Sequence, residues 1–269
     1  MRPSSRTAVV YASDWFNDVV DVFAQSGSKW HAFQRLSIDM TQPSGIATDR
    51  DGNLWVAQTL GNGAYAFDLS TLRPVFALDD AGHEPYAIAI DRAGDAYLAN
   101  TFDLEDAGFV NYYPAGSQEA SYRITDPSFE YLYGLAVDGA ANLYVSYLDA
   151  SGDGAISKFS PGSQGPGQNL GLEPGSYFGM AFDRTGNLLV ANYGAGEIDV
   201  FAPGAHKPAK RFGHRGRPWS IAFNRGGTRL FVADFERNQL EEYSYPAGVL
   251  VGTIPGEKGG EFVGVATGP

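Results

Sequence analysis

The 269-residue chain contains no cysteine, which excludes disulfide bonds, thiolate metal ligands and cysteine nucleophiles. It also has no apolar run of the roughly 18 residues that a membrane-spanning helix needs. Basic residues are scarce, since 19 Lys and Arg stand against 31 Asp and Glu, for a net charge of −12. Affinity for nucleic acid and for anionic lipid comes mainly from Lys and Arg. We therefore expect no nucleic acid partner and no membrane insertion.

Hydrophobic residues make up 43% of the chain, which is enough to form a buried core. The 34 glycines and 15 prolines favour many turns over long helices. The length suits one large all-β domain or two ordinary domains.

One pattern recurs five times: a short apolar strand, a turn of the D-x-x-G type, and a second apolar strand that ends in a small or polar residue. The copies span 45–58, 87–100, 134–147, 179–192 and 220–234. The turns begin at Asp49, Asp91, Asp138, Asp183 and Asn224, at spacings of 42, 47, 45 and 41 residues. An Asx side chain caps such a turn, so we expect these residues to be scaffold. We expect the same of the arginines that follow four of them, Arg50, Arg92, Arg184 and Arg225.

Each copy continues with a third apolar strand, and four of these strands end in a Pro-Gly turn, at 113–116, 160–162, 202–204 and 245–248. A fourth strand then precedes the next copy. Units of four short strands that repeat every 40–50 residues or so indicate a β-propeller.

The two ends of the chain complement each other. Residues 264–268 match an innermost strand, and residues 9–12, 19–24 and 31–38 match the three strands that should follow it. The last strand should therefore pair with the first three and close a ring. We predict a single all-β domain over 1–269, a six-bladed β-propeller of four-stranded antiparallel blades. The blades should lie at approximately 43–84, 85–131, 132–175, 176–216, 217–258, and 259–269 together with 7–42.

At these residues the chain resembles the six-bladed propellers built on NHL-type repeats. It is also similar to the SMP-30/gluconolactonase, strictosidine-synthase-like and virginiamycin B lyase-like propellers; the last have a GNLW-type repeat, present here as Gly52-Asn53-Leu54-Trp55. The resemblance spans essentially all of 7–269. It implies the fold, whereas activities differ widely among such scaffolds.

The resemblance implies that a ligand would meet the mouth where the innermost strands begin. The residues just before those strands are Ser44, Tyr86, Tyr133, Phe178, Trp219 and Val263. SMP-30-like enzymes hold a divalent cation with Asn or Asp at such positions, and none stands here, so we predict no metal-ligating residues. The four aromatic side chains should either pack together as a plug or form a surface for an apolar or sugar ligand.

A second set of positions follows the second strand of each unit. It comprises Asp14, Gln58, Asn100, Tyr147, Asn192 and Asp234. These polar side chains should either hydrogen-bond a ligand above the aromatic residues or satisfy the backbone of their own loops.

Ionisable residues in the loops that enter the innermost strands are the candidates for catalysis, because a His beside a carboxylate suits general acid–base chemistry. They are His83, Glu84, His214 and Glu261. Virginiamycin B lyases use His and Glu with a metal, but Gln58 stands where their repeat carries a Glu. Strictosidine-synthase-like enzymes place a Glu near the start of the last inner strand, as Glu261 is here.

Two functions follow from these residues. The first is a binding propeller whose mouth holds a small molecule, a glycan or a protein loop, without a cofactor. The alternative is a lyase or hydrolase that acts on a lactone or cyclic ester at the same mouth, with a divalent cation such as Ca²⁺ or Mg²⁺. Residues 1–6 lack the apolar stretch of a secretory signal. The cysteine-free, acidic chain nevertheless suits an extracytoplasmic (periplasmic or secreted) protein, with the cytoplasm as the alternative.

Overall fold

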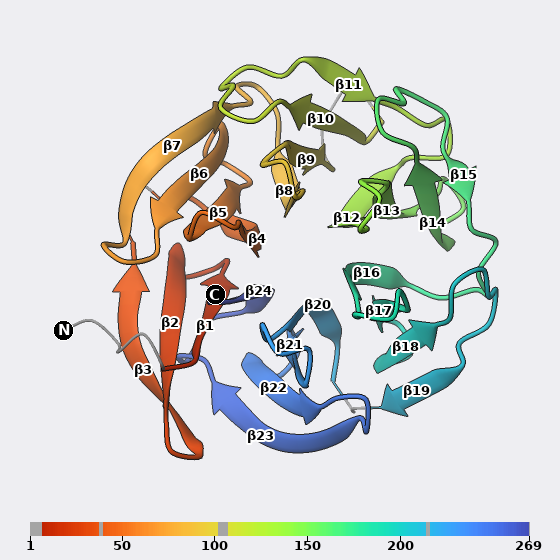
Figure 1. Ribbon diagram of the computed structural model, residues 1–269. Coiled ribbons are helices and arrows are strands. Elements are labelled where there is room, and N and C mark those ends of the chain that lie inside the picture. Colours follow the sequence, from red (N-terminus) through yellow and green to blue (C-terminus); the bar gives the residue numbers. More distant parts are fainter. Residues whose placement is uncertain (1–6, 38–39, 102–106, 214–215, 269) are drawn as a thin grey trace.

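The computed structural model describes residues 7–37, 40–101, 107–213 and 216–268. Within these ranges the chain forms 24 strands in six four-stranded sheets, arranged around a central axis (Figure 1). The described residues include no helix, and hence none that could cross a membrane. The predicted six-bladed propeller is confirmed.

The first three blades follow one another along the chain. Blade 1 consists of β4 (Pro43–Thr48), β5 (Asn53–Gln58), β6 (Gly63–Asp68) and β7 (Arg73–Asp79). Blade 2 consists of β8 (Pro85–Ile90), β9 (Ala96–Asn100), β10 (Phe109–Tyr113) and β11 (Tyr122–Ile124). Blade 3 consists of β12 (Tyr131–Val137), β13 (Leu143–Leu148), β14 (Gly154–Phe159) and β15 (Gln168–Asn169).

The other three blades complete the ring. Blade 4 consists of β16 (Tyr177–Phe182), β17 (Leu188–Asn192), β18 (Glu197–Phe201) and β19 (Lys210–Gly213). Blade 5 consists of β20 (Pro218–Phe223), β21 (Arg229–Asp234), β22 (Gln239–Ser244) and β23 (Val249–Pro255). Blade 6 consists of β24 (Phe262–Thr267), β1 (Val9–Asp14), β2 (Val19–Ser26) and β3 (Lys29–Leu36).

Blade 6 joins the two ends of the chain, as the sequence predicts. Its strand order is β24-β1-β2-β3, and Ala12 of β1 lies opposite Val265 of β24. The aromatic ring of Phe262, which is fully buried, packs edge-on against Phe23 of β2 at 6.1 Å. Strand pairing and core packing therefore close the ring together.

The hydrophobic core is divided among the interfaces between blades. Six clusters of buried side chains occur among the described residues, and each joins two neighbouring blades. The second strands are almost entirely buried because both of their faces are covered; all five residues of β17 are buried. The outermost strands are largely exposed, as β3 is. No blade has a core of its own, so the blades should unfold together.

The turns between first and second strands show why the D-x-x-G pattern recurs. Asp49 Oδ1 accepts hydrogen bonds from the amides of Asp51 (3.0 Å) and Asn53 (2.8 Å), and Oδ2 accepts one from the Trp55 indole N–H (2.8 Å). The tryptophan of the GNLW element therefore supports the turn, and the scaffold role of the aspartate is confirmed. Within the described residues, the arginine after it takes no part in this capping.

The same capping lowers the pKa of the aspartate in blade 4. Burial alone would raise the pKa of Asp183, but hydrogen bonds from the Tyr245 hydroxyl and from Asn187 outweigh burial and lower the pKa to about 2. Asp183 thus carries its charge at every physiological pH, and its oxygens are occupied by the turn.

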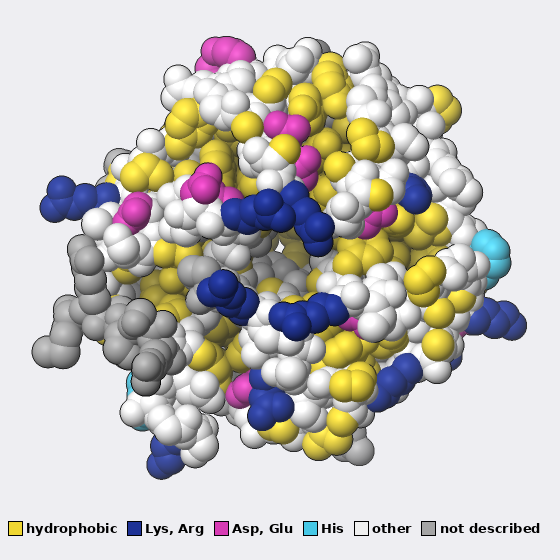
Figure 2. Space-filling model, viewed as in Figure 1, with side chains coloured by type: hydrophobic (Ala, Val, Ile, Leu, Met, Phe, Trp, Pro, Cys, Tyr) yellow, Lys and Arg dark blue, Asp and Glu magenta, His cyan; other side chains and the backbone are white. Residues whose placement is uncertain are grey.

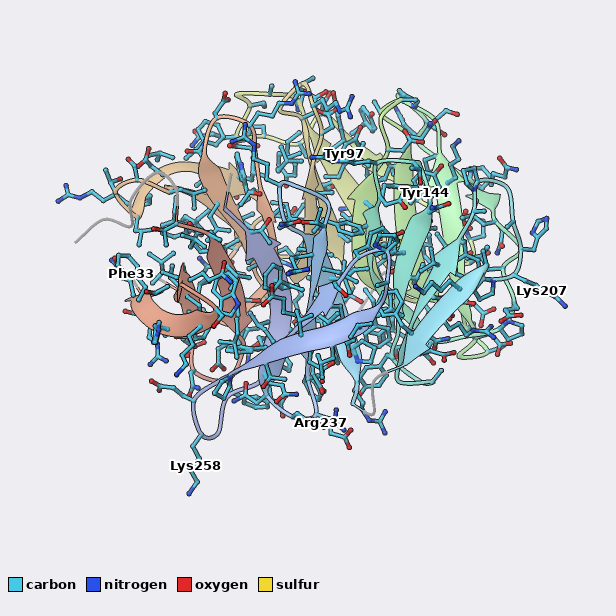
Figure 3. All side chains as sticks on the ribbon, turned by 60° about the horizontal axis from the view of Figure 1, so that its bottom comes forward. Phe33, Tyr97, Tyr144, Lys207, Arg237 and Lys258 are labelled. Atoms are coloured by element: carbon cyan, nitrogen blue, oxygen red, sulfur yellow. The ribbon has the colours of Figure 1, made fainter. Side chains whose placement is uncertain are left out.

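The two faces of the ring differ in their loops. We call the face where the innermost strands begin the mouth face, and the face with the turns between first and second strands the turn face. Tyr97 and Tyr144, at the starts of β9 and β13, lie toward the turn face, whereas Arg237 and Lys258 lie on the mouth face (Figure 3). Figures 1 and 2 look onto the turn face.

Truncating Phe262 to alanine should test the closure of the ring. The substitution leaves a cavity beside Phe23 at the interface of blades 5 and 6, so we expect a loss of about 3–5 kcal/mol in the free energy of unfolding, still in one transition. Urea denaturation followed by fluorescence and by circular dichroism would measure it. Phe16→Ala, at a side chain that is 60% exposed, is the control and should change stability by less than about 0.5 kcal/mol. Two separate transitions in the Phe262 variant would contradict a core shared among blades.

Candidate functional site

An aromatic cluster fills one side of the mouth. The rings of Tyr133, Phe178 and Tyr193 form a parallel stack, with centroids 3.9 Å and 4.6 Å apart. Trp219 packs edge-on against Phe178 at 4.8 Å and stacks on Phe235 at 4.6 Å. These five residues come from blades 3, 4 and 5, and we call them the aromatic cluster.

The aromatic cluster narrows the channel through the ring. Tyr86 contacts Tyr133 and Trp219 at ring distances of 6.0 Å and 6.2 Å. The cavity that these three side chains line on the axis has a volume of only about 70 Å³. That volume holds two or so water molecules, at about 30 Å³ each, and is far below the roughly 300 Å³ of a ligand pocket. Of the two predicted roles for the mouth aromatics, packing together as a plug matches these ring contacts. Tyr86, Tyr133 and Trp219 are nevertheless only half-buried.

The predicted polar residues after the second strands are all buried at the mouth face. Four of them make hydrogen bonds to nearby backbone or side-chain groups. Asp14 accepts from the amides of Asn17 and Glu261, and Asp234 accepts from the amide of Arg217. Asn192 accepts from the amide of Ser176 and donates to Asp199, while the Tyr147 hydroxyl bonds Ser157.

The other two polar residues have atoms without partners among the described residues. Gln58 Oε1 accepts a bond from the amide of Thr41 at 2.9 Å, but its Nε2 has none. Asn100 has no partner for either its Oδ1 or its Nδ2, although the side chain is only 1% exposed. A buried polar group without a partner costs about 1–3 kcal/mol, so such groups call for a ligand or water.

Glu261 provides an ionisable group at the same face. Its Oε2 is buried and has no hydrogen-bond partner among the described residues. The same is true of the indole N–H of neighbouring Trp15. Burial raises the pKa of Glu261, and the negative charge of nearby Asp14 raises it further. The charge of Glu261 also contributes to the raised pKa of Tyr86, which comes mainly from burial. The carboxyl group thus belongs to the mouth face of blade 6, beside Asp14.

These observations divide the mouth into two halves. The partnerless atoms of Trp15, Gln58, Asn100 and Glu261 come from blades 6, 1 and 2, whereas the aromatic cluster comes from blades 3, 4 and 5. Ser44 and Val263, the small residues among the six mouth positions, also lie on the polar side. The sequence places both sets at the mouth face but does not reveal this asymmetry.

The candidate catalytic histidines lie elsewhere or outside the described residues. The His83 ring packs edge-on against Phe109 of β10 at 4.9 Å, and its Nε2 is 3.3 Å from Arg123 Nη2 of β11. It thus faces the outer strands of blade 2. Glu84 lies beside it in the loop before β8 and is half-buried. His214 falls outside the described residues, so the roles of these three residues remain predictions.

The described residues assemble no cluster of His, Asp and Glu side chains at the mouth. Hard cations take about six to eight oxygen ligands, and Asp14, the carboxylate next to Glu261, already accepts bonds from Asn17 and from a backbone amide. Among the described residues no three His, Asp or Glu side chains gather as a metal site would require. We therefore derive no chemical step through a metal.

Sequence reasoning missed the residue that follows each polar position. Trp15, Tyr193 and Phe235 occupy that place in blades 6, 4 and 5, and all three contribute rings to the mouth. Aligning the repeats one residue further would have found them. Arg211 of β19 forms ion pairs with Glu197 and Asp199 of β18.

Comparisons with known proteins agree with the fold. No family model matches the chain. Diisopropyl-fluorophosphatase of Loligo vulgaris is 33% identical over 76 residues, a stretch that covers 28% of this chain and only 24% of the relative. A propeller from a nidogen/laminin complex superposes with a TM-score of 0.76 at 16% identity and covers 98% of both chains.

Streptogramin B lyase superposes with a TM-score of 0.58 at 15% identity, over 82% of this chain and 70% of that chain. At such identities the likeness shows the architecture alone. This chain is a six-bladed β-propeller, with a lyase among its structural neighbours and diisopropyl-fluorophosphatase as a partial sequence match.

Replacing Glu261 by glutamine should stabilise the protein at neutral pH. The folded-state pKa of Glu261 is raised above its usual value of 4.5, so wild-type stability falls as the pH rises above about 4.5 and the unfolded chain ionises first. Glu261→Gln removes that loss, so we expect the variant to be more stable than the wild type at pH 7. Below pH 4 both proteins should be equally stable. Urea denaturation at pH 4 and pH 7 would measure the difference in the free energy of unfolding. A gain in stability that does not depend on pH would contradict a raised pKa for Glu261.

Proposed function

We propose that this propeller binds a small hydroxylated molecule of the glycan class at its mouth face. The observation that carries the proposal is the set of partnerless polar atoms of Gln58, Asn100 and Glu261, which lie opposite the aromatic cluster. Amide and carboxyl groups donate to and accept from hydroxyls, and an aromatic face packs on the apolar face of a sugar ring.

The contacts within the mouth favour a ligand on top of the aromatic cluster rather than inside the channel. The axial cavity of about 70 Å³ is too small for a sugar ring, whereas Tyr86, Tyr133 and Trp219 are only half-buried. A bound hydroxyl near Glu261 would give its buried oxygen the partner that it lacks. Binding would thereby recover part of the free energy that the unpaired groups cost.

Saturation-transfer NMR with glucose, N-acetylglucosamine, cellobiose and chitobiose tests this proposal. We expect at least one of them to bind, and Asn100→Leu and Glu261→Gln to weaken that binding by about tenfold or more. Both variants remove partnerless groups, so neither should destabilise the fold, and thermal unfolding would verify this. Arg50→Gln, on the turn face, is the matched control and should bind normally. Absence of binding by all four sugars, or equal affinity in all variants, would refute the proposal.

A second candidate is hydrolysis or elimination at the same mouth, and the raised pKa of Glu261 favours it. A carboxyl group whose pKa is raised is better suited to act as a general acid than one with the ordinary value. The match to diisopropyl-fluorophosphatase and the fold shared with streptogramin B lyase support this candidate as well.

Turnover assays would separate the two candidates. δ-Valerolactone and diisopropyl fluorophosphate are the test substrates, each with Ca²⁺, with Mg²⁺ and with a chelator. An enzyme should lose activity by about a hundredfold or more in Glu261→Gln, with little change in Arg50→Gln. No turnover of either substrate under any condition, together with sugar binding, would leave the first proposal standing alone.

A further inference from the structure

A groove opens on the turn face between blades 3 and 4, on the side of the ring away from the mouth. Its main cavity has a volume of about 760 Å³, and an adjoining cavity of about 310 Å³ extends it inward to the inner strands. Arg92 and Arg184 line both cavities. In Figure 2, Lys and Arg side chains surround the central opening of this face. The groove is thus the largest of the cavities described here, and the proposed function does not use it.

Two features of blade 3 create the groove. Its turn reads Gly139-Ala140, where the turns of blades 1, 2, 4 and 5 carry an arginine at the first of these positions. A Cβ atom at Gly139 would lie 3.8 Å from the guanidinium of Arg92, so that guanidinium extends over the small turn. The outermost strand, β15, is only two residues long, which leaves the outer part of the interface open.

The cationic side chains of the groove have few hydrogen-bond partners among the described residues. Among the described residues, Arg92 makes no ion pair or side-chain hydrogen bond, and Arg184 makes one hydrogen bond, to the carbonyl oxygen of Arg225 at 2.6 Å. Lys158 lies over the Tyr144 ring, with Nζ 5.6 Å from the centroid. These three positive charges keep nearly all of their donors available.

The two acidic side chains that line the main cavity, Asp138 and Asp183, both accept several hydrogen bonds from their own turns. Asp138 accepts from the amides of Ala140 and Asn142, from the Asn142 side chain and from the Tyr144 hydroxyl. Asp183 accepts a comparable set in blade 4. Carboxylates saturated in this way take no further donors from a ligand, whereas guanidinium groups bind oxyanions in two-pronged geometry.

The walls of the groove are apolar. The Tyr144 and Phe182 rings meet edge-on at 4.8 Å, and Leu188 and Phe201 lie beside them. His206 closes the outer end, because its Nδ1 bonds the carbonyl oxygen of Leu170 at 2.8 Å and so bridges blades 4 and 3. The groove therefore combines a hydrophobic body with cations at its inner end.

We propose that this groove binds a small organic anion, a carboxylate or phosphate ester attached to an apolar or aromatic body. The oxyanion contacts Arg92 and Arg184 beside the central opening, and the body lies along Tyr144 and Phe182. A volume of about 760 Å³ is typical of small-molecule sites. The net charge of −12 opposes the approach of an anion only weakly, because salt screens distant charges beyond about 8–10 Å.

Isothermal titration calorimetry with three matched probes tests the site: 4-phenylbutyrate, 4-phenylbutyl phosphate and the uncharged 4-phenylbutan-1-ol. We expect one or both anions to bind, and the alcohol to bind at least about tenfold more weakly, because it lacks the charge-assisted hydrogen bonds. The two anions distinguish a carboxylate ligand from a phosphate ester. Raising the salt from 50 to 500 mM should weaken the binding of either.

The double variant Arg92→Gln/Arg184→Gln should lose about tenfold or more in affinity for the bound anion. Arg50→Gln removes the equivalent arginine of blade 1, which does not line the groove, and should leave the affinity unchanged. All three side chains are exposed, so thermal unfolding should not change. The proposal is overturned if neither anion binds, if the alcohol binds as tightly, or if Arg50→Gln weakens binding as much as the double variant. Sugar binding at the mouth does not bear on these outcomes.

Discussion

The packing of each blade against its two neighbours is the constraint on which the rest of the structure depends. Each of the six buried clusters joins two blades, so every blade relies on both neighbours for its core. Pairing of β24 with β1 supplies the sixth interface and leaves no blade with an uncovered face. A ring held in this way presents the loops of six blades on two rigid faces, and both candidate sites lie on such loops and on the residues next to them.

The mouth face carries groups that the fold itself does not need. Asp14 and Asp234 bond their own loops, but Asn100 and Glu261 are buried without partners among the described residues. A stable fold alone would favour an apolar side chain at position 100, because a buried amide without partners costs free energy. Such local costs are typical of functional sites, where stability is given up for binding or reactivity. The aromatic cluster opposite supplies the rigid surface against which a ligand would be held.

The turn face shows how a repeated structural element becomes a possible binding site where one copy departs from the rest. The aspartates cap their turns, and the arginines that follow are exposed on the surface. In blade 3, Gly139 replaces the arginine, and the guanidinium of Arg92 extends over the gap. The shortened β15 opens the same interface further out. Two local changes in one blade thus open the groove, and Arg92 and Arg184 of the neighbouring blades supply its charge.

The sequence by itself determines the fold, because turn chemistry and strand length are local properties that repeat five times. The Asp49 and Asp183 turns, the pairing of 264–268 with 9–12, and the mouth positions all follow from the repeats. It does not determine which side chains are satisfied, since Gln58, Asn100 and Asn192 look alike in the alignment. Their partners come from other loops, and only the tertiary structure brings those loops near. The same holds for His83, whose ring faces β10 and β11 because of how the loop before β8 packs.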